Sequence, residues 1–211
     1  MFPTDTLLAY VAACVLVILA PGPDNILAVS RGLSQGRLAA ALSSVGAGIG
    51  ILCHTLAAAF GLSLLIQGSA TAFWVVKAVG ALYLLWLGAR ALLAGNLVTF
   101  APAERLPLRR VLVIGILSNV LNPKPGLFVL AFVPQFCDAG RGPVAAQMLV
   151  YGTIFAVMTA AIFTLLGGSA SRLSAWLRAR PRAVRAVNVG AGATFVAAGL
   201  SVLALKQRAA A

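Results

Sequence analysis

The sequence contains few charged residues, and acidic residues are the rarest of these. Four of its 211 residues are Asp or Glu, one is His, and charged residues make up 9% of the chain. Soluble domains carry about 25% charged residues. A globule of this size could not cover its surface with so little polar material. The composition therefore excludes an ordinary soluble domain, and the 61% of apolar residues excludes a disordered chain.

The scarcity of His, Cys and acidic residues also limits the chemistry. The three cysteines are odd in number and have no repeated spacing, so they predict neither a disulfide framework nor a zinc site. Neither the His-Glu-x-x-His zinc motif nor the ATP-binding loop Gly-x-x-x-x-Gly-Lys-Ser/Thr occurs. Because one histidine cannot complete most acid–base constellations, we expect no enzyme, no metal site and no cofactor.

Six apolar segments follow one another along the chain, and each is long enough to span a bilayer as a helix. They cover residues 7–29, 39–66, 72–93, 111–133, 145–166 and 187–205. Gly, Pro, Ser and Arg separate them, as in loops. The sequence therefore predicts an all-α integral membrane protein with six transmembrane helices in a single domain. The stretch before residue 7 has no basic residue, so we expect the first segment to stay as a helix rather than be cleaved as a signal peptide.

The net charge of +12 arises from sixteen Lys and Arg that lie mainly between the apolar segments. They are not interleaved with aromatic residues, so we expect no nucleic-acid partner. Eleven of them, including Arg31 and Arg37, follow the first, third or fifth segment. This bias predicts that these loops face the cytoplasm of a bacterial inner membrane and that both termini lie outside. The last cluster is also predicted to attract anionic membrane lipids, and it comprises Arg172, Arg178, Arg180, Arg182 and Arg185.

The two halves of the chain share a proline pattern. Pro21 and Pro23 interrupt the first segment, and Pro123 and Pro125 interrupt the fourth, 102 residues later. Gly-Arg pairs at 36–37 and 140–141 follow in each half. We predict repeat 1 over 1–95, a cytoplasmic linker over 96–108 and repeat 2 over 109–211. Three spans per repeat is an odd number, so the second repeat must be inverted, an arrangement typical of secondary transporters.

The interruptions predict a polar cavity near the middle of the membrane. Each proline lacks an N–H and frees the carbonyl four residues earlier. These carbonyls belong to Val17, Leu19, Asn119 and Leu121. In hydrocarbon they must be satisfied by protein or by cavity water. The half-helices that follow the breaks, with Gly22 beside the first proline pair, would aim their positive ends at the cavity.

Two ionisable residues lie within these breaks. Asp24 is the one acidic residue deep in an apolar segment, and Lys124 is the one basic residue. Because intramembrane charges are costly, we interpret both as substrate-binding residues. Two other interpretations stay open: Asp24 could stabilise the first turn of its helix, and Lys124 could merely neutralise Asp24. The two charges could also pair in the resting state and be separated by substrate.

Amide side chains and one histidine complete the candidate site. Asn25, Asn119 and Asn122 add polar groups beside the breaks and are candidate substrate ligands. Asn122 before Pro123 equally fits an ordinary N-cap. His54 is a second candidate for proton coupling after Asp24, because its pKa is ordinarily near neutrality. A lone histidine in a helix bundle also fits a neutral hydrogen-bonding group.

Gly46, Gly48 and Gly50 give the second segment a smooth face. Close helix packing explains such a face without chemistry. The same face would allow a homodimer, so the sequence does not decide between internal packing and self-association.

Several motifs in order along the chain resemble the LysE/RhtB amino-acid exporter family. The first two are Pro21-Gly22-Pro23-Asp24-Asn25 and Ser30-Arg31-Gly32-Leu33-Ser34-Gln35-Gly36-Arg37. The next two are Gly50-Ile51-Leu52-Cys53-His54-Thr55 and Lys77-Ala78-Val79-Gly80-Ala81-Leu82-Tyr83-Leu84. The last comprises Asn122-Pro123-Lys124 and Phe132-Val133-Pro134-Gln135-Phe136. The resemblance covers nearly the whole chain and is closer to the homoserine/threonine branch than to the basic-amino-acid branch.

The resemblance implies a secondary exporter of amino acids or related small metabolites, neutral or homoserine/threonine-like, driven by the electrochemical gradient through proton antiport. Asp24 would meet the substrate ammonium, and Lys124 with a half-helix N-terminus would meet its carboxylate. Pro125 departs from the family pattern, in which a small residue more usually follows the lysine, so it bears on the cavity shape and substrate identity.

Three other classes of function compete with export of amino acids. A metal-ion exporter would need several ligands facing one cavity, whereas Cys53 and His54 are neighbours that point about 100° apart on a helix. An intramembrane enzyme would need more acid–base groups than the chain offers. A non-transporting membrane assembly factor would show a lipid-facing groove and no gradient-driven flux.

Overall fold

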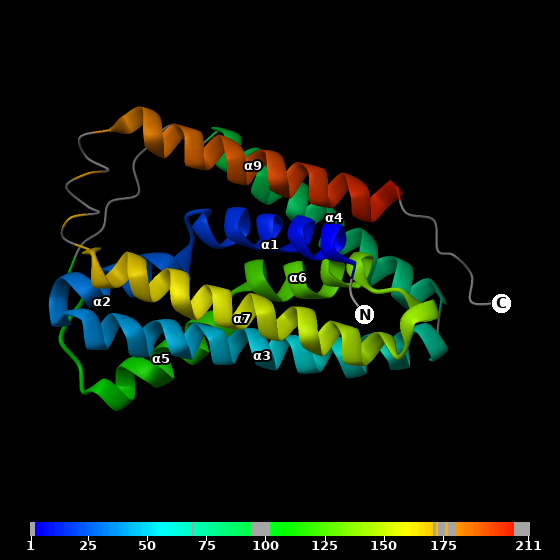
Figure 1. Cartoon of the computed structure of the whole chain (residues 1–211), viewed down its shortest axis with the longest axis horizontal. Coiled ribbons are helices and arrows are strands. Elements are labelled where there is room, and N and C mark those ends of the chain that lie inside the picture. Colours follow the sequence, from blue (N-terminus) through cyan, green and yellow to red (C-terminus); the bar gives the residue numbers. More distant parts are fainter. Residues whose placement is uncertain are drawn as a thin grey trace.

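The protein is all-helical in this computed structural model, which describes residues 3–68, 70–93, 102–170, 172, 176 and 180–204. The first four helices are α1 (Thr4–Leu19), α2 (Pro23–Gln35), α3 (Arg37–Gly68) and α4 (Ala70–Leu93). The others are α5 (Leu108–Val120), α6 (Pro123–Ala131), α7 (Val144–Gly168) and α9 (Pro181–Ala204), with the 3-10 turns η1 (Val133–Phe136) and η2 (Ala139–Arg141). These ranges contain no β-strand. Figure 1 shows the helices running along the long axis, with the start of α1 and the end of α9 at the same end.

The six predicted apolar segments all fall on helices. Within the described residues, Arg37–Gly61 and Val144–Gly168 are long and apolar enough to cross a membrane as single helices. Two pairs meet the same test jointly, α1 with α2 and α5 with the stretch Pro123–Phe136, and they bend by 61° and 52° at their breaks. Shorter apolar stretches lie in α4 and α9. The chain is thus an all-α protein with two to four candidate spans by length and composition.

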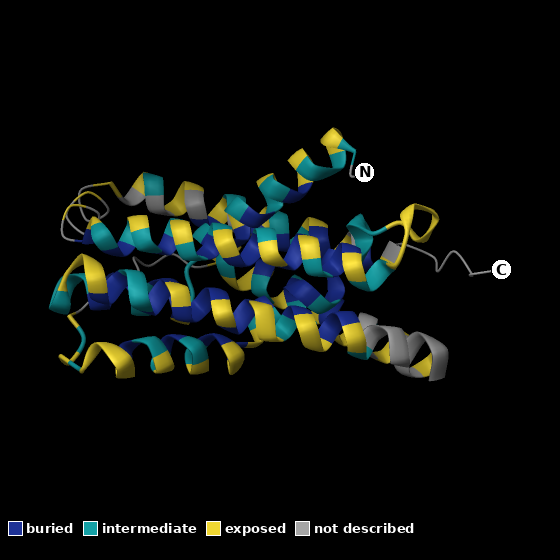
Figure 2. Cartoon of the chain, turned by 60° about the horizontal axis from the view of Figure 1, so that its bottom comes forward, coloured by how far each residue is buried: buried dark blue, intermediate teal, exposed yellow. Residues whose placement is uncertain are grey.

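The surface of the bundle is apolar where a soluble protein would be polar. Figure 2 shows buried positions on the inward faces of the helices and exposed positions on the outward faces. Many large apolar side chains are on those outward faces, for example Phe60, Leu82, Val157 and Leu165. Apolar surface on this scale indicates contact with another apolar medium. Lipid is the medium that fits a helical bundle of this composition.

Glycines bring the helices into close contact inside the bundle. A Cβ at Gly46 would lie 2.6 Å from the carbonyl oxygen of Leu112 on α5, and a Cβ at Gly48 would lie 3.1 Å from that of Ala156 on α7. Gly50 faces Asn119 at 2.6 Å in the same way. The smooth face of α3 is therefore used for internal packing, which small residues permit because backbones can approach closely.

The crossing of α2 and α7 supplies a stability prediction. A Cβ at Gly167 would lie 2.6 Å from both the carbonyl oxygen of Ala28 and the Cβ of Ala40, so the Gly167→Ala variant must push helices apart. Overpacking of this kind costs about 1–3 kcal/mol. We expect Gly167→Ala to lower the melting temperature of the purified protein in detergent.

The adjacent glycine provides the matched control. A Cβ at Gly168 would meet nothing closer than the Cγ of Arg37 at 3.7 Å, an ordinary contact. Gly168→Ala should leave the melting temperature unchanged or raise it slightly, since alanine is the better helix former. Equal melting temperatures for the Gly167→Ala and Gly168→Ala variants would contradict the close crossing.

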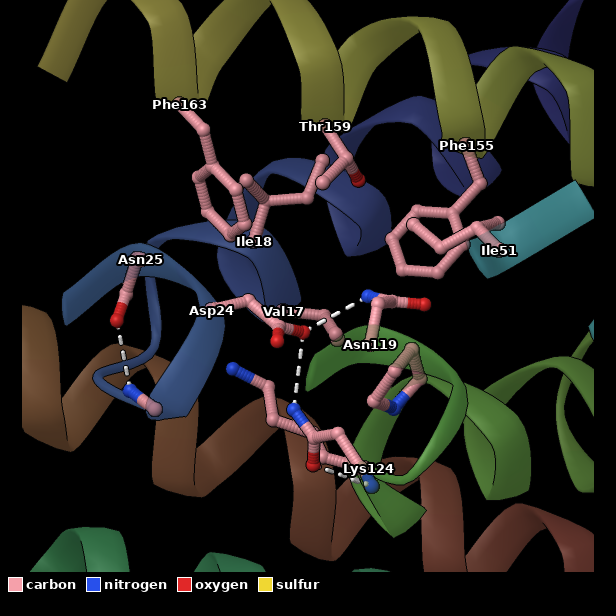
Figure 3. Close-up of a pocket in the computed structure, with 13 residues that line it drawn as sticks. Val17, Ile18, Asp24, Asn25, Ile51, Asn119, Lys124, Phe155, Thr159 and Phe163 are labelled. Carbon is pink, nitrogen blue, oxygen red and sulfur yellow. Dashed lines mark hydrogen bonds between the residues drawn. The ribbon is translucent and has the colours of Figure 1, made fainter. Parts of the chain in front are cut away.

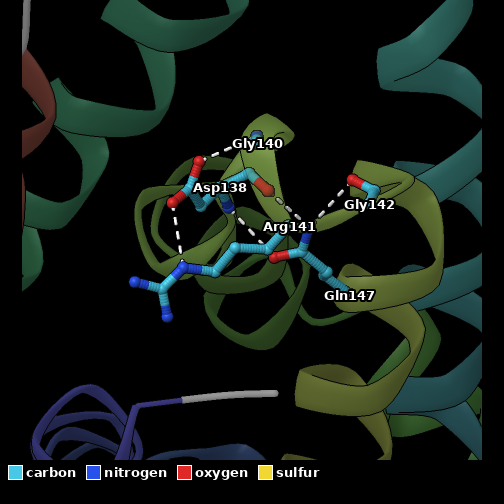
Figure 4. A network of polar contacts seen from close by, with 5 residues as sticks. All are labelled: Asp138, Gly140, Arg141, Gly142 and Gln147. Atoms are coloured by element: carbon cyan, nitrogen blue, oxygen red, sulfur yellow. Dashed lines mark hydrogen bonds and ion pairs between the residues drawn. The ribbon is translucent and has the colours of Figure 1, made fainter.

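Left-handed glycines start the two longest described helices. Gly36 has φ 82° directly before α3, and Gly142 has φ 119° shortly before α7. The sequence pattern pairs Gly36 with Gly140, but the structure pairs it with Gly142. Figure 4 shows why the second turn is longer: Gln147 of α7 donates to the carbonyls of Asp138 (2.7 Å) and Gly142 (3.0 Å) and accepts from the Asp138 N–H (3.0 Å). The exposed Asp138–Arg141 ion pair in this turn, at 3.0 Å, adds little to stability.

Arg31 corrects the predicted first loop. The sequence placed it in a loop after the first span, whereas α2 continues to Gln35 and only Gly36 separates α2 from α3. Arg31 is 5% exposed, and its Nη1 donates to the carbonyl of Glu104 and to Gln35 Oε1. Arg31 thus ties Glu104, in the predicted linker, to α2. Residues 96–101 of that linker, Arg178 and position 205 of the last predicted span lie outside the described residues.

Candidate functional site

The two proline breaks place the starts of α2 and α6 at one site. Gly22 is the N-cap of α2 and Pro23 is its first residue, whereas Asn122 is the N-cap of α6 and Pro123 is its first residue. A proline fits the first helical position because that N–H has no intrahelical partner. The helix starts are therefore offset by 100 residues rather than by the 102 of the sequence pattern.

This register makes Asp24 and Lys124 equivalent. Each is the second residue of its half-helix, and the two carry opposite charges. The positive end of α2 favours the carboxylate of Asp24, but the same end of α6 disfavours the ammonium of Lys124. Lys124 therefore reaches away from its own helix, towards the carbonyl end of α1.

Asp24 is held by three donors from the other half of the chain. Its Oδ1 accepts from the hydroxyl of Ser118 at 2.9 Å. Its Oδ2 accepts from the Nδ2 of Asn119 at 2.7 Å and from the Nδ2 of Asn122 at 2.9 Å. The residue is 8% exposed.

Lys124 is bonded to the end of α1. Its Nζ donates to the Ala20 carbonyl at 2.7 Å and lies 5.9 Å from the centre of the Phe195 ring. Within the described residues the ion pair is Arg141–Asp138, so Asp24 and Lys124 do not pair directly. Each half-helix thus extends its charged residue to the broken helix of the other half, and the two charges stay separate.

Of the four carbonyls that the prolines were predicted to free, the structure shows protein partners for that of Asn119. The carbonyl of Asn119 accepts from the Asn122 N–H at 3.0 Å and contacts the His54 Nε2 at 3.1 Å. At the first break the bonded carbonyl is that of Ala20, not of Val17 or Leu19, because α1 ends at Leu19 and Ala20 turns away from the helix. Ala20 accepts from Lys124 and also from the Asn25 Nδ2 at 3.0 Å.

The three asparagines have different roles. Asn25 uses both ends of its amide to bond backbone atoms at the first break. Its Oδ1 accepts from the Gly22 N–H at 2.8 Å, and its Nδ2 donates to the Ala20 carbonyl. Asn122 is the predicted N-cap, because its Oδ1 accepts from the Lys124 N–H at 3.1 Å. Its Nδ2 bonds Asp24, and its contact with a substrate stays a prediction. Asn119 uses its Nδ2 for Asp24 and has an unpartnered Oδ1.

A small cavity lies between the two breaks and α7. Figure 3 shows Asp24, Asn119 and Lys124 on one side of it and the α7 side chains of Phe155, Thr159 and Phe163 on the other. Its volume is about 20 Å³, room for about one water molecule. An amino acid does not fit this space, so the helices must move apart to admit one. The other lining residues are Val17, Ile18, Gly22, Asn25, Ile51, Asn122 and Pro125.

The family model for LysE type translocators matches residues 15–206 of the chain. The chain belongs to this family. It is therefore a membrane transport protein and not an enzyme. The matched residues include both breaks, Asp24 and Lys124.

Curated relatives agree with this assignment. The chain is 31% identical to a protein named "Uncharacterized membrane protein" from Vibrio cholerae, over 94% of this chain and 97% of that one. It is 30% identical to the homoserine/homoserine lactone efflux protein of Salmonella typhi, over 90% and 92%. It is 28% identical to the leucine efflux protein of Klebsiella pneumoniae, over 90% of each chain. No solved structure matches the chain significantly.

In this LysE-family chain His54 lies apart from the central cavity. It borders a separate groove between α3 and α6, with a volume of about 330 Å³. A Cβ at Gly126 would lie 2.9 Å from the imidazole, so glycine allows the ring to pack against α6. The contact of its Nε2 with the Asn119 carbonyl, at 3.1 Å, fits the alternative role as a hydrogen-bonding group.

A serine motif and the possible metal ligands of the chain can also be located in the structure. Residues 32–36 match the hydrolase pattern Gly-x-Ser-x-Gly, but Ser34 lies inside α2 and its hydroxyl bonds the Arg31 carbonyl at 3.4 Å. A hydrolase nucleophile would need a strand-to-helix turn. No group of three or more His, Cys, Asp or Glu gathers among the described residues, and Cys14, Cys53 and Cys137 are free.

The residues that sequence reasoning missed are those of α7 and the apolar wall. Phe155, Thr159 and Phe163 are four residues apart and share one face of α7. Their segment is apolar and has no proline or charge, so no pattern in it indicated which face would meet the breaks.

Proposed function

We propose that this protein exports small neutral amino acids across the bacterial inner membrane by proton antiport. The observation that carries the proposal is the separate placement of Asp24 and Lys124 at one cavity. An amino acid bears an ammonium and a carboxylate on one carbon, and such a site offers a partner for each. The efflux of homoserine and leucine named for relatives agrees with this class of substrate.

The relation between the halves supports alternating access by two inverted repeats. In the proposed repeats α2, α3 and α4 correspond to α6, α7 and α9. α2 and α6 start at equivalent residues, and α3 and α7 follow equivalent turns. α3 packs on its counterpart α7, and α4 packs on its counterpart α9. α2 also contacts α7, and its counterpart α6 contacts α3 in the same way. Rocking of one repeat against the other would open the cavity to each side in turn. The eleven basic residues that follow the first, third and fifth segments support an orientation with both termini outside.

Proton coupling is proposed to use the carboxylate of Asp24. A carboxylate can hold either a proton or the substrate ammonium, but not both at once. Release of the amino acid outside would let Asp24 take a proton, which it would deliver to the cytoplasm on the return step. Substrate and proton then move in opposite directions through one group.

The experiment that tests the proposal is a panel of labelled amino acids. Cells with and without the protein are loaded with each compound, and efflux is followed with and without a proton uncoupler. We expect faster, uncoupler-sensitive efflux of small neutral amino acids. If no compound responds at confirmed expression, the exporter function is wrong, and an assembly factor that uses the groove at His54 becomes the better hypothesis.

A substitution of His54 tests whether His54 or Asp24 carries the coupled proton. Gln can donate from its amide to the Asn119 carbonyl, so the His54→Gln variant should fold and keep proton-driven efflux close to wild type. Its pH dependence should also be unchanged, because the titrating group is elsewhere. Efflux measured at several pH values checks this, and loss of proton-driven flux in a folded His54→Gln protein would make His54 the coupling residue.

A further inference from the structure

Thr159 is a buried helical threonine whose hydroxyl differs in its bonding from those of Thr55, Thr153 and Thr194. The hydroxyls of Thr55, Thr153 and Thr194 donate to the carbonyl four residues earlier in their own helices, at 2.8, 2.7 and 2.9 Å. This local bond is the usual solution for a threonine in an apolar helix. Thr159 is 2% exposed, yet its Oγ1 makes no such bond and has no other partner among the described residues. Its hydroxyl lines the cavity instead (Figure 3).

A second unpartnered atom belongs to another residue of the cavity lining. Asn119 is 1% exposed, and its Oδ1 has no hydrogen-bond partner within the described part of the chain. A buried polar atom without a partner destabilises the fold, so two of them on residues of one cavity indicate a missing polar group. A cavity with room for about one water molecule is also the right size for a hydroxyl.

The chemistry of the two atoms calls for a group that can both donate and accept a hydrogen bond. The Oδ1 of Asn119 only accepts, whereas the hydroxyl of Thr159 can donate and accept. A ligand hydroxyl can donate to the first and accept from the second. The substrate ammonium has a different place, because the Nδ2 of Asn119 faces Asp24 and the Oδ1 of the same amide faces the other way.

The remaining walls exclude a charged substrate side chain. Asp24 and Lys124 are the charged residues among those that line the cavity, and the proposed function assigns both to the α-ammonium and α-carboxylate. The residues flanking Thr159 are apolar, namely Ile51, Phe155 and Phe163. The substrate side chain must therefore be short, uncharged and able to form a hydrogen bond.

We infer that Thr159 and the Oδ1 of Asn119 form a specificity site for the side-chain hydroxyl of a small neutral amino acid. This inference rests on the proposed function. The family resemblance already implies homoserine/threonine-like substrates, and the inference names the residues that would make such a substrate preferred over an apolar amino acid of the same shape. A site built to bond a hydroxyl rejects the analogue without it, because its own polar atoms are then left unpaired.

The test compares hydroxylated amino acids with apolar isosteres. Purified protein in proteoliposomes exchanges the best labelled amino acid from the efflux panel, and unlabelled threonine, valine, homoserine and norvaline compete. We expect threonine and homoserine to inhibit at concentrations roughly tenfold or more below those of valine and norvaline. Equal inhibition by both classes would overturn the inference, while exchange itself would uphold the proposed function.

Two valine variants assign the preference to Thr159. Thr159→Val keeps the side-chain shape and should shrink the gap between threonine and valine to about twofold, with valine exchange retained. Thr153→Val is the matched control, since Thr153 is an exposed residue of the same helix whose hydroxyl bonds Leu149, and it should leave the gap unchanged. An unchanged gap in Thr159→Val, with protein that elutes as a single species, would overturn the role of Thr159.

Discussion

Asp24→Asn is expected to abolish proton-driven efflux while leaving the protein folded. The Asn side chain can place its oxygen where Oδ2 accepts from Asn119 and Asn122, and its amide can donate to Ser118, whose hydroxyl rotates to accept. The polar contacts are thus kept, but the charge is lost. Without the carboxylate, no group holds the substrate ammonium or carries the proton.

The expected size of the effect follows from the loss of a buried charge. Removing one partner of a buried, hydrogen-bonded charge pair costs about 2–5 kcal/mol, which is at least about thirtyfold in rate. Flux is measured in proteoliposomes with an imposed pH gradient. Asp5→Asn is the control, because Asp5 is an exposed residue of the first turn of α1 and should leave flux unchanged. Full flux in folded Asp24→Asn protein would remove Asp24 from the mechanism.

Composition and proline positions predicted the fold class and the centre of the site. In lipid a helix break is costly, so two matched breaks that each hold a charge indicate a site by their sequence pattern alone. The sequence could not predict that Asp24 and Lys124 stay apart. Their separation depends on Asn119, Asn122 and the Ala20 carbonyl, which lie at the right distances only in the folded chain.

The first residues of α2 and α6, and the α7 residues that line the cavity, could not be predicted from the sequence for a related reason. Either proline of a Pro-x-Pro pair can begin a helix, and packing decided for Pro23 in one half and Pro123 in the other. In the sequence nothing distinguishes Thr159 from other threonines of apolar helices, because the sequence does not show which face of α7 meets the cavity. The specificity of the site therefore depends on tertiary contacts, whereas its charge pattern is local.

Lys124→Met should remove recognition of the substrate carboxylate without unfolding the break. The Ala20 carbonyl keeps its bond from Asn25, so no buried acceptor is left without a partner. Among the described residues, one hydrogen bond from the Lys124 ammonium is found, which leaves two of its three donors for a ligand. Loss of this charge-assisted contact should weaken amino-acid binding about 100-fold, the size expected for an interaction of about 2.7 kcal/mol.

An amino-acid amide separates carboxylate recognition from a structural role of Lys124. The wild type should bind an amino acid far more tightly than the corresponding α-carboxamide, which lacks the negative charge. Lys124→Met should bind both with similar affinity, because the variant loses only the interaction with the substrate carboxylate. Arg109→Met, at an exposed position in the first turn of α5, should keep the wild-type preference. If Lys124→Met weakens the amino acid and its amide by the same factor, Lys124 supports the break and the substrate carboxylate binds elsewhere.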